Sequence, residues 1–135
     1  MDDIVVDTSA FVAIFKGEGP ASSLRSRLGR AGGVIVPATC LVEIALLRRL
    51  DGQLLDWTRD LLSQPPYQIV DLTLAEAHIG ADAARRFGKG SGHPAQLNFG
   101  DCLVYATAKY RNLPLLFVGD DFTKTDIAAV PAKDN

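Results

Sequence analysis

Short apolar runs alternate with longer segments of helical period along almost the whole chain. Four runs have the length and composition of buried strands, and they are Met1–Val6, Val34–Val36, Gln68–Leu72 and Leu115–Val118. The segments of helical period between them are Thr8–Phe15, Pro20–Arg30, Thr39–Leu50, Gln53–Ser63, Thr73–Phe87 and Phe99–Arg111. Strands that alternate with helices predict an α/β fold, in which helices flank both faces of a central parallel sheet.

Length and composition favour a single domain that spans residues 1–135. With 135 residues, 47% of them hydrophobic, the chain is long enough to bury about two-thirds of its unfolded surface in one core. The amino terminus lacks the basic and then apolar layout of a signal peptide, and no apolar run approaches the roughly 20 residues that cross a bilayer. We therefore expect a cytoplasmic protein with no membrane segment.

Charge and the few reactive side chains narrow the function classes. A formal net charge of −2 gives no broad basic surface, so nucleic-acid chemistry would need local basic residues or metal ions. Cys40 and Cys102 lie among apolar residues and match no zinc spacing with His78 or His93, which favours buried thiols and structural histidines. The sequence has no Gly-x-x-x-x-Gly-Lys motif for phosphates, and Ser9 lacks the Gly-x-Ser-x-Gly context of an activated nucleophile.

Carboxylates stand beside the apolar runs, where isolated charges are usually avoided. They are Asp7, Glu43, Asp101 and the adjacent pair Asp120 and Asp121. A charge in such surroundings must be paired, be neutralised by a raised pKa, or bind a cation.

The predicted topology brings these acids to one edge of the sheet. Asp7 and the Asp120–Asp121 pair directly follow strands, and Glu43 lies one turn into the helix that leaves the second strand. The helix from Asp101 to Arg111 is about 15 Å long, and the fourth strand runs back over about 16 Å. Because the two lengths match, Asp101 at the start of the helix lies at the same edge as the end of the strand. All of the acids are therefore expected beyond the carboxyl ends of the strands, where open parallel sheets bind ligands.

Helical spacing predicts that Glu43 and Asp101 point inward at this edge. The apolar residues that share their stripes are Leu46, Leu47 and Leu50 for Glu43, and Val104, Tyr105 and Ala108 for Asp101. Like charges this close repel each other, and a divalent cation offsets the repulsion. Oxygen ligands without imidazole or thiolate select Mg²⁺ or Mn²⁺, which can activate water and stabilise a phosphodiester during in-line attack.

Each acid also has an ordinary structural explanation. Asp7 can cap the first helix, Asp101 can be the third residue of a capped helix, and Asp120–Asp121 can form a turn. Glu43 fits no such role, because with Thr39 as the helix cap the capping-box acid would fall at position 42. A separate structural explanation for each acid would require four coincidences at one edge of the sheet, whereas a single metal site explains all of them.

Four segments of the chain form an ordered set. They are Val5–Ala10 (VVDTSA), the helix around Glu43, His93–Ala106 (HPAQLNFGDCLVYA) and Pro114–Asp126 (PLLFVGDDFTKTD). This set resembles the PIN-domain ribonucleases, specifically the VapC toxins of prokaryotic toxin–antitoxin pairs. A lone Asp-Thr-Ser is weak, but Phe-Gly-Asp followed by Gly-Asp-Asp-Phe-x-x-Thr-Asp is specific, and the likeness covers nearly the whole chain.

The resemblance implies an endoribonuclease that depends on Mg²⁺, for which Mn²⁺ can substitute. It implies Asp7, Glu43 and Asp101 as the central catalytic and metal-binding acids. The fourth position stays open among Asp120, Asp121 and Asp126; we take Asp120 as the metal ligand and keep Asp121 as a catalytic candidate, since neighbours on a strand face opposite sides. Thr8, Ser9 and Asn98 would orient ligands or water from a second layer.

The resemblance also implies partners. These are a VapB-like antitoxin, an RNA substrate, and a second copy of the chain in a homodimer or a toxin–antitoxin hetero-oligomer. Basic residues near the edge are candidate RNA contacts, and they are Arg85, Arg86, Lys89 and Lys124. We expect the antitoxin in an apolar groove between the first two helices and the Thr39–Leu50 helix. The side chains that suggest this groove are Phe11, Ile14, Phe15, Leu24, Leu28, Leu46 and Leu50.

Two other functions remain open. A non-catalytic RNA- or protein-binding module on the same fold would show no metal-dependent turnover. A phosphatase or receiver-like phosphoacceptor is disfavoured, because its paired acids would here follow the fourth strand without an obvious partner lysine. Fold alone does not separate these functions.

Overall fold

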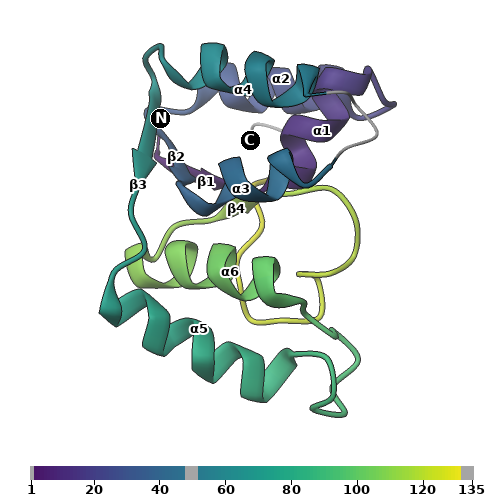
Figure 1. Cartoon of the computed structure of the whole chain (residues 1–135), viewed down its shortest axis with the longest axis vertical. Helices are drawn as coiled ribbons and strands as arrows, with labels where there is room; N and C mark the ends of the chain where they lie inside the picture. Colours follow the sequence, from purple (N-terminus) through teal and green to yellow (C-terminus); the bar gives the residue numbers. More distant parts are fainter. Residues whose placement is uncertain (1, 48–51, 132–135) are drawn as a thin grey trace.

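The computed structural model describes residues 2–47 and 52–131, whose strands form a parallel four-stranded sheet (Figure 1). The strands are β1 (Ile4–Val6), β2 (Val34–Pro37), β3 (Tyr67–Val70) and β4 (Leu115–Leu116), in the order β3-β2-β1-β4. In β1, Val5 pairs with Ile35 of β2 on one side and with Leu115 of β4 on the other. The predicted α/β fold with a central parallel sheet is therefore confirmed.

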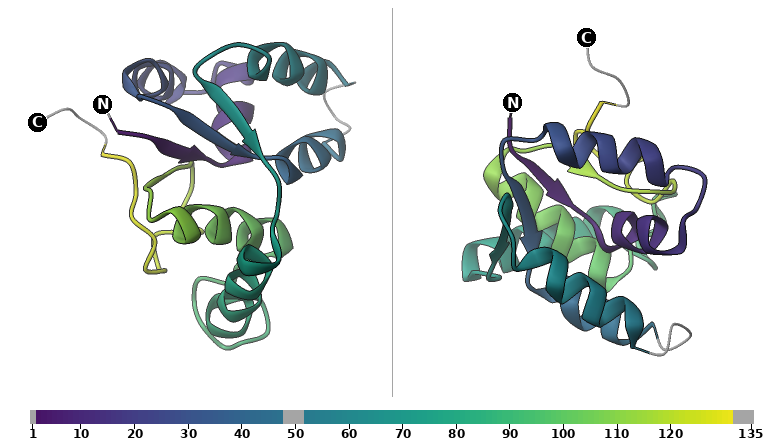
Figure 2. Two further views of the ribbon diagram at one scale, coloured as in Figure 1. Left: turned by 90° about the vertical axis from the view of Figure 1, so that its left-hand side faces the viewer. Right: turned by 90° about the horizontal axis from the view of Figure 1, so that it is seen from above.

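Helices cover both faces of the sheet. They are α1 (Thr8–Lys16), α2 (Ala21–Arg30), α3 (Thr39–Ala45), α4 (Gln53–Leu62), α5 (Leu74–Phe87) and α6 (Phe99–Arg111). Helices α1, α2 and α4 lie on one face, while α6 packs on the other face and α5 packs outside α6 (Figures 1 and 2). Helix α3 contacts α1, α4 and α6, so it sits where the layers meet. None of the helices in the described ranges is long and apolar enough to cross a membrane.

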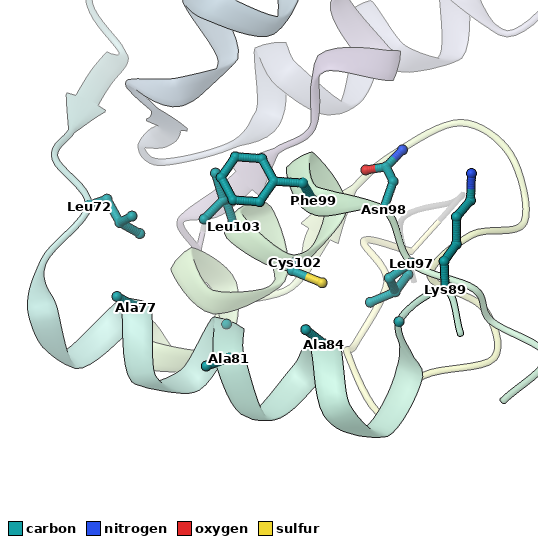
Figure 3. Close-up of a pocket in the computed structure, with 12 residues that line it drawn as sticks. Leu72, Ala77, Ala81, Ala84, Lys89, Leu97, Asn98, Phe99, Cys102 and Leu103 are labelled. Carbon is teal, nitrogen blue, oxygen red and sulfur yellow. The ribbon is translucent and has the colours of Figure 1, made fainter. Parts of the chain in front are cut away.

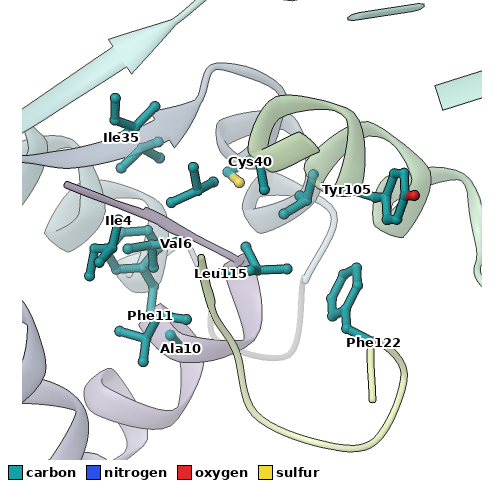
Figure 4. Close-up of a cluster of buried hydrophobic side chains, with 14 of the residues drawn as sticks. Ile4, Val6, Ala10, Phe11, Ile35, Cys40, Tyr105, Leu115 and Phe122 are labelled. Carbon is teal, nitrogen blue, oxygen red and sulfur yellow. The ribbon is translucent and has the colours of Figure 1, made fainter. Parts of the chain in front are cut away.

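The core fills the space between the sheet and its helices (Figure 4). Every residue of β1 and β4 is buried, as expected for strands in the middle of a covered parallel sheet. Phe11 of α1 is completely buried, and Phe122 reaches the cluster from the C-terminal segment. Burial of each large apolar side chain contributes about 1.5–3 kcal/mol, so this cluster holds the edge of the sheet in place.

Helix α3 differs from its prediction. It ends at Ala45 instead of Leu50, and its cap is Ala38 instead of Thr39. The amide of Leu47 donates to the carbonyl of Ile44, a three-residue hydrogen bond that tightens the last turn and ends the helix. The predicted inward stripe is wrong at Leu46, which is 64% exposed, while Leu50 lies outside the described residues.

Strand β4 is also shorter than the predicted Leu115–Val118. The amide of Val118 donates to Ser9 Oγ at 3.0 Å, so the chain is fastened to α1 there and leaves the sheet. The remaining elements differ from their predicted bounds by up to three residues, and the predicted start of the first strand, Met1, lies outside the described residues.

Helices α5 and α6 are fastened together by a buried ion pair. Glu76 is completely buried; its Oε1 accepts from Arg111 of α6 at 2.5 Å, and its Oε2 accepts from the Thr73 backbone amide at 2.9 Å. The Thr73 hydroxyl in turn accepts from the Glu76 amide, which completes a capping box at the start of α5. Burial raises the pKa of Glu76, but the hydrogen bonds from Arg111 and Thr73 outweigh it and leave the pKa below its ordinary value.

Candidate metal centre

Asp7 occupies the junction of β1 and α1. Its backbone is extended, and its Oδ2 accepts from the Ser9 amide at 3.0 Å, which caps α1. The residue is only 7% exposed. Burial raises the pKa of Asp7, the hydrogen bonds from Ser9 lower it, and the net shift is upward. Asp7 therefore both caps α1 and points into the buried edge of the sheet.

Asp101 lies in the first turn of α6 and closes a capping box with Asn98. The Asp101 amide donates to Asn98 Oδ1 at 2.8 Å, and the Asn98 amide donates to Asp101 Oδ2 at 3.1 Å. Burial, together with the charges of Asp7 and Asp121, raises the pKa of Asp101 to about 6. The sequence offered a helix-start role and a site role as alternatives, and the structure shows the helix-start role beside two other acids.

Glu43 reaches this cluster from α3. Its Oε1 accepts from the Thr8 hydroxyl at 3.4 Å, and its carboxylate lies directly against Gly100 in the first turn of α6. A Cβ at position 100 would overlap the carboxylate, so glycine is required for this approach. Burial and, to a smaller extent, the charges of Asp7 and Asp101 together raise the pKa of Glu43 to about 7.

The segment after β4 supplies the fourth acid. Asp120 and Asp121 are both exposed, and the Asp120 carbonyl accepts from the amide and hydroxyl of Thr123 in a turn. The Asp121 charge raises the pKa of both Asp7 and Asp101. Asp126 instead accepts from Tyr105 and Lys109. Of the three candidates, Asp121 is the one whose charge reaches the other acids.

The donor set fits a hard divalent cation. Within residues 2–47 and 52–131 the acids do not converge tightly enough to form a ready-made group of three metal ligands. The pKa values of Asp7, Glu43 and Asp101 are all raised, chiefly by burial, and the charges of neighbouring acids add to the increase. A carboxylate has two oxygens and about four lone-pair sites, so the helix caps do not use up the ligand capacity of Asp7 and Asp101.

The residues predicted to form a second layer each contact an acid or its segment. Thr8 donates to Glu43, and Asn98 holds Asp101. Ser9 accepts from the Val118 amide, so it ties the start of the Asp121 segment to the helix that Asp7 caps. These contacts fix the acids to three helices and to the end of β4.

The four candidate RNA contacts occupy different surroundings. Lys89 is exposed, and its charge lowers the pKa of Asp101, so it lies close enough to act at the acidic edge. Arg86 instead lies over the Phe87 ring at 4.6 Å and pairs with Asp126 at 3.9 Å. Arg85 and Lys124 are exposed.

Two features of the site were not recognised in the sequence. Gly100 belongs to the Phe-Gly-Asp motif, but only the position of Glu43 explains why the residue must be glycine. Cys40 was expected to be a buried thiol and is completely buried, yet it also lies beside the site. Burial raises the pKa of its thiol to about 12, the Thr8 hydrogen bond lowers it, and the charges of Asp7 and Glu43 raise it.

An apolar groove lies beside Asn98 and Phe99, at the start of the helix that carries Asp101 (Figure 3). It has a volume of about 560 Å³ and runs between α5 and α6. Small side chains such as Ala77, Ala81 and Ala84 line it on the α5 side, and Phe99 and Lys89 line it as well. Phe99 is 81% exposed, an unusual position for a large aromatic ring in the first turn of a helix.

Comparison with known protein families identifies a match that contains these acids. The PIN domain family matches residues 4–128, which include all of the acids described above. The chain is a PIN domain. It is 43% identical over 126 residues to Ribonuclease VapC42 of Mycobacterium tuberculosis, covering 92% of this chain and 96% of that protein. It is 34% identical over 139 residues to VapC ribonuclease R02377 of Rhizobium meliloti, covering 90% and 97%. This PIN domain therefore belongs with the VapC proteins.

Solved structures agree on the fold. The PIN domain superposes on Mycobacterium tuberculosis VapC20, a Sarcin-Ricin loop cleaving toxin, with a TM-score of 0.75 at 16% identity over 94% of this chain and 98% of that one. A toxin–antitoxin complex from Klebsiella pneumoniae matches with a TM-score of 0.71 at 17% identity, covering 98% and 99%. At these identities the superpositions confirm the PIN fold.

Proposed function

We propose that this PIN domain is a metal-dependent endoribonuclease and the toxin of a toxin–antitoxin pair. The observation that carries the proposal is the cluster of Asp7, Glu43 and Asp101, three acids with raised pKa values at the carboxyl end of the sheet. The VapC ribonucleases that resemble it over nine-tenths of its length support the same activity. We assign its place of action to the cytoplasm.

Asp7, Asp101 and Asp121 are the residues that would hold Mg²⁺ or Mn²⁺, with Glu43 beside them. Asp121 takes the place predicted for Asp120 from the sequence, because the charge of Asp121 acts on Asp7 and Asp101. When bound, the cation supplies Lewis-acid stabilisation of the phosphodiester and makes water a stronger nucleophile. Glu43 is suited to accept a proton from the attacking water, because its pKa of about 7 without metal lies near the working pH. Lys89 stands at the rim, where it can attract the RNA backbone toward an otherwise acidic edge.

The antitoxin has a candidate docking groove on the opposite layer. An apolar groove of about 330 Å³ lies between α1, α2 and α4. Its walls include Ile14, Leu28, Trp57, Leu61 and Tyr67. The proposed groove keeps the first two helices of the predicted location, but its third wall is α4 and not α3, none of whose described residues line it. We propose that an apolar helix of the antitoxin occupies this groove.

A second copy of the chain is the partner we propose for the face around the acids. Val42 of α3 and Leu46, which follows the helix, are each 64% exposed. Helix α3 contacts the start of α6 through Glu43 and Gly100, and the neighbouring Phe99 is 81% exposed. Exposed apolar side chains gathered in this way mark interaction surfaces. A homodimer through this face would enclose the acids of both copies in one shared cleft.

RNA cleavage with controlled metal tests the proposed function. Purified protein is incubated with total cellular RNA in Mg²⁺ or in excess EDTA, and the cleavage ends are mapped. We expect discrete ends only with Mg²⁺. Equal cleavage in EDTA would overturn the metal mechanism, and intact RNA under both conditions would favour a non-catalytic binding module on the same fold.

A further inference from the structure

The segment that carries Asp121 is fastened to the sheet at both of its ends. It leaves β4 at Leu116 and returns beside the same strand, where the Leu115 amide donates to the Ala128 carbonyl at 2.8 Å and the Val130 amide donates to the Leu115 carbonyl at 3.0 Å. Between these points the chain forms a strap, residues 117–127, that passes the acidic edge. The position of Asp121 depends on how this strap is held in the middle.

Asp126 holds the strap against α6. Tyr105 donates its hydroxyl to Asp126 Oδ1 at 2.5 Å, and Lys109 Nζ donates to Oδ2 at 3.0 Å. Arg86 of α5 adds a longer ion pair at 3.9 Å. Burial raises the pKa of Asp126, but the hydrogen bonds from Tyr105 and Lys109 outweigh it, so the carboxylate is ionised and its charge is met by these donors. The contacts of Asp126 with Tyr105, Lys109 and Arg86 therefore hold the strap against α5 and α6.

The contacts of Asp126 fall on the same face of α6 as Asp101. Residues 101, 105 and 109 are spaced four apart, so Asp101, Tyr105 and Lys109 lie along one stripe of a single rigid helix. Tyr105 is only 3% exposed, and its ring packs against Phe87, so the hydroxyl cannot move far. The strap is therefore tied to the same rigid body that carries Asp101.

The buried ring of Phe122 transmits this anchor to Asp121. Phe122 is 2% exposed and lies 5.2 Å from the Phe117 ring, and its carbonyl accepts from the Thr125 hydroxyl at 2.7 Å. Asp121 immediately precedes Phe122, so a fixed ring leaves its backbone little freedom. With Asp126 released, the strap would keep its two ends on β4 but lose the contact that sets its distance from α6.

We propose that Asp126 is a positioning residue, which holds the Asp121 carboxylate at a fixed distance from Asp101 by binding Tyr105 and Lys109. The inference rests on the proposed metal-dependent function, because Asp121 matters there as a metal ligand. It assigns different tasks to two of the three acids of the Gly-Asp-Asp-Phe-x-x-Thr-Asp motif: Asp121 faces the cation, and Asp126 fixes the segment. Groups that orient metal ligands typically change affinity by 10-fold to 100-fold when they are removed.

Calorimetric titration with Mn²⁺ at neutral pH tests the inference without any RNA. Asp126→Ala should weaken Mn²⁺ binding by about 10-fold or more. Asp126→Asn should weaken it less, because its amide oxygen can still accept from Tyr105. Tyr105→Phe, which keeps the ring in the core, should also weaken binding. The exposed Asp82 of α5 provides the matched control, and Asp82→Asn should bind as the wild type does.

A double-mutant cycle separates positioning from a general loss of structure. If Asp126 acts through Asp121, Asp126→Ala should cause no further loss of Mn²⁺ affinity in an Asp121→Asn background. An equal loss in both backgrounds, or wild-type affinity in Asp126→Ala, would overturn the positioning role and leave the proposed function standing. If Asp126→Ala fails to fold, unchanged affinity in Tyr105→Phe would overturn it. Wild-type protein that binds no Mn²⁺ would overturn both this inference and the metal mechanism.

Discussion

At the residue scale, the central acids combine structural and chemical roles. Asp7 caps α1 and Asp101 caps α6, yet both are buried beside other carboxylates. We predict that Asp7→Asn, Glu43→Gln and Asp101→Asn each lower the rate of RNA cleavage by about 10²–10³-fold, the usual effect of removing one charge-stabilising group. Asparagine at 101 can still accept from the Asn98 amide, so the fold should persist. Circular dichroism checks folding, and wild-type turnover in all three variants would contradict the assignment.

The raised pKa values predict how pH affects the metal-free protein. Glu43 titrates at about 7 in the folded chain, against an ordinary value of 4.5. Stability from such a group is complete below the unfolded pKa and is lost as pH rises through the folded one. Glu43→Gln abolishes this loss. In EDTA, its melting temperature should therefore gain on the wild type between pH 5 and pH 8, and a difference that stays constant with pH would contradict the shift.

Gly100 offers a test of the close approach between α3 and α6. Gly100→Ala should displace the Glu43 carboxylate, the end of a flexible side chain, and so lower the rate of RNA cleavage more than the melting temperature. Gly29→Ala in α2 is the matched stability control, because its added methyl group meets open space. Alanine inside a helix is favoured over glycine by roughly 0.5–1 kcal/mol, so this control should be neutral or stabilising. If Gly100→Ala behaves like the control, Glu43 does not occupy this position.

At the scale of elements, the periodicity of apolar residues in the sequence correctly predicted the helices and strands. Helix α6 has the predicted bounds, and the strands fall within three residues of theirs, because long apolar patterns determine them. The predicted ends of α3 and β4 were wrong. The end of β4 depends on a contact between residues far apart in the sequence, which a local pattern does not contain. Val118 leaves the sheet because Ser9, more than a hundred residues earlier, accepts its amide. Asp121 could not be separated from Asp126 without knowing that Tyr105 and Lys109 bind Asp126. It could not be separated from Asp120 without knowing that its charge acts on Asp7 and Asp101.

The pairing of α5 with α6 predicts a further effect on stability. Glu76→Gln would leave the Arg111 guanidinium without its charge partner in a largely buried position. Breaking a buried pair from one side costs about 3 kcal/mol or more. Because the pKa of Glu76 is lowered, its contribution is present above the unfolded pKa and is lost as pH falls through the folded one. Urea denaturation at neutral pH should show the difference, and a loss below about 0.5 kcal/mol would contradict it.

At the scale of the whole molecule, two apolar surfaces leave room for two partners. One is the groove between α1, α2 and α4, and the other is the face that carries the exposed Val42 and Leu46 side chains. We predict a dimer in sedimentation experiments, and Leu46→Asp should shift it to a monomer because the exposed Leu46 side chain lies in the proposed contact. A monomeric wild type would contradict this assignment.

The antitoxin assignment makes a separate prediction. Trp57 lines the groove and packs against Phe15 with ring centroids 5.4 Å apart. When the chain is co-expressed with the small open reading frame beside its gene, the partner should co-purify, and Trp57→Ala should release it. Retention of the partner by Trp57→Ala would place the antitoxin on another surface.

The central claim is that Asp7, Asp101 and Asp121, with Glu43 beside them, form one cation site at the carboxyl end of the sheet. A crystal structure of the protein soaked in Mn²⁺, with anomalous scattering measured near the manganese edge, tests this most directly. We predict an anomalous peak within coordinating distance of the Asp7, Asp101 and Asp121 carboxylates, and no such peak in crystals of Asp101→Asn. A peak bound elsewhere on the molecule, or an empty acidic edge in the wild type, would contradict the account.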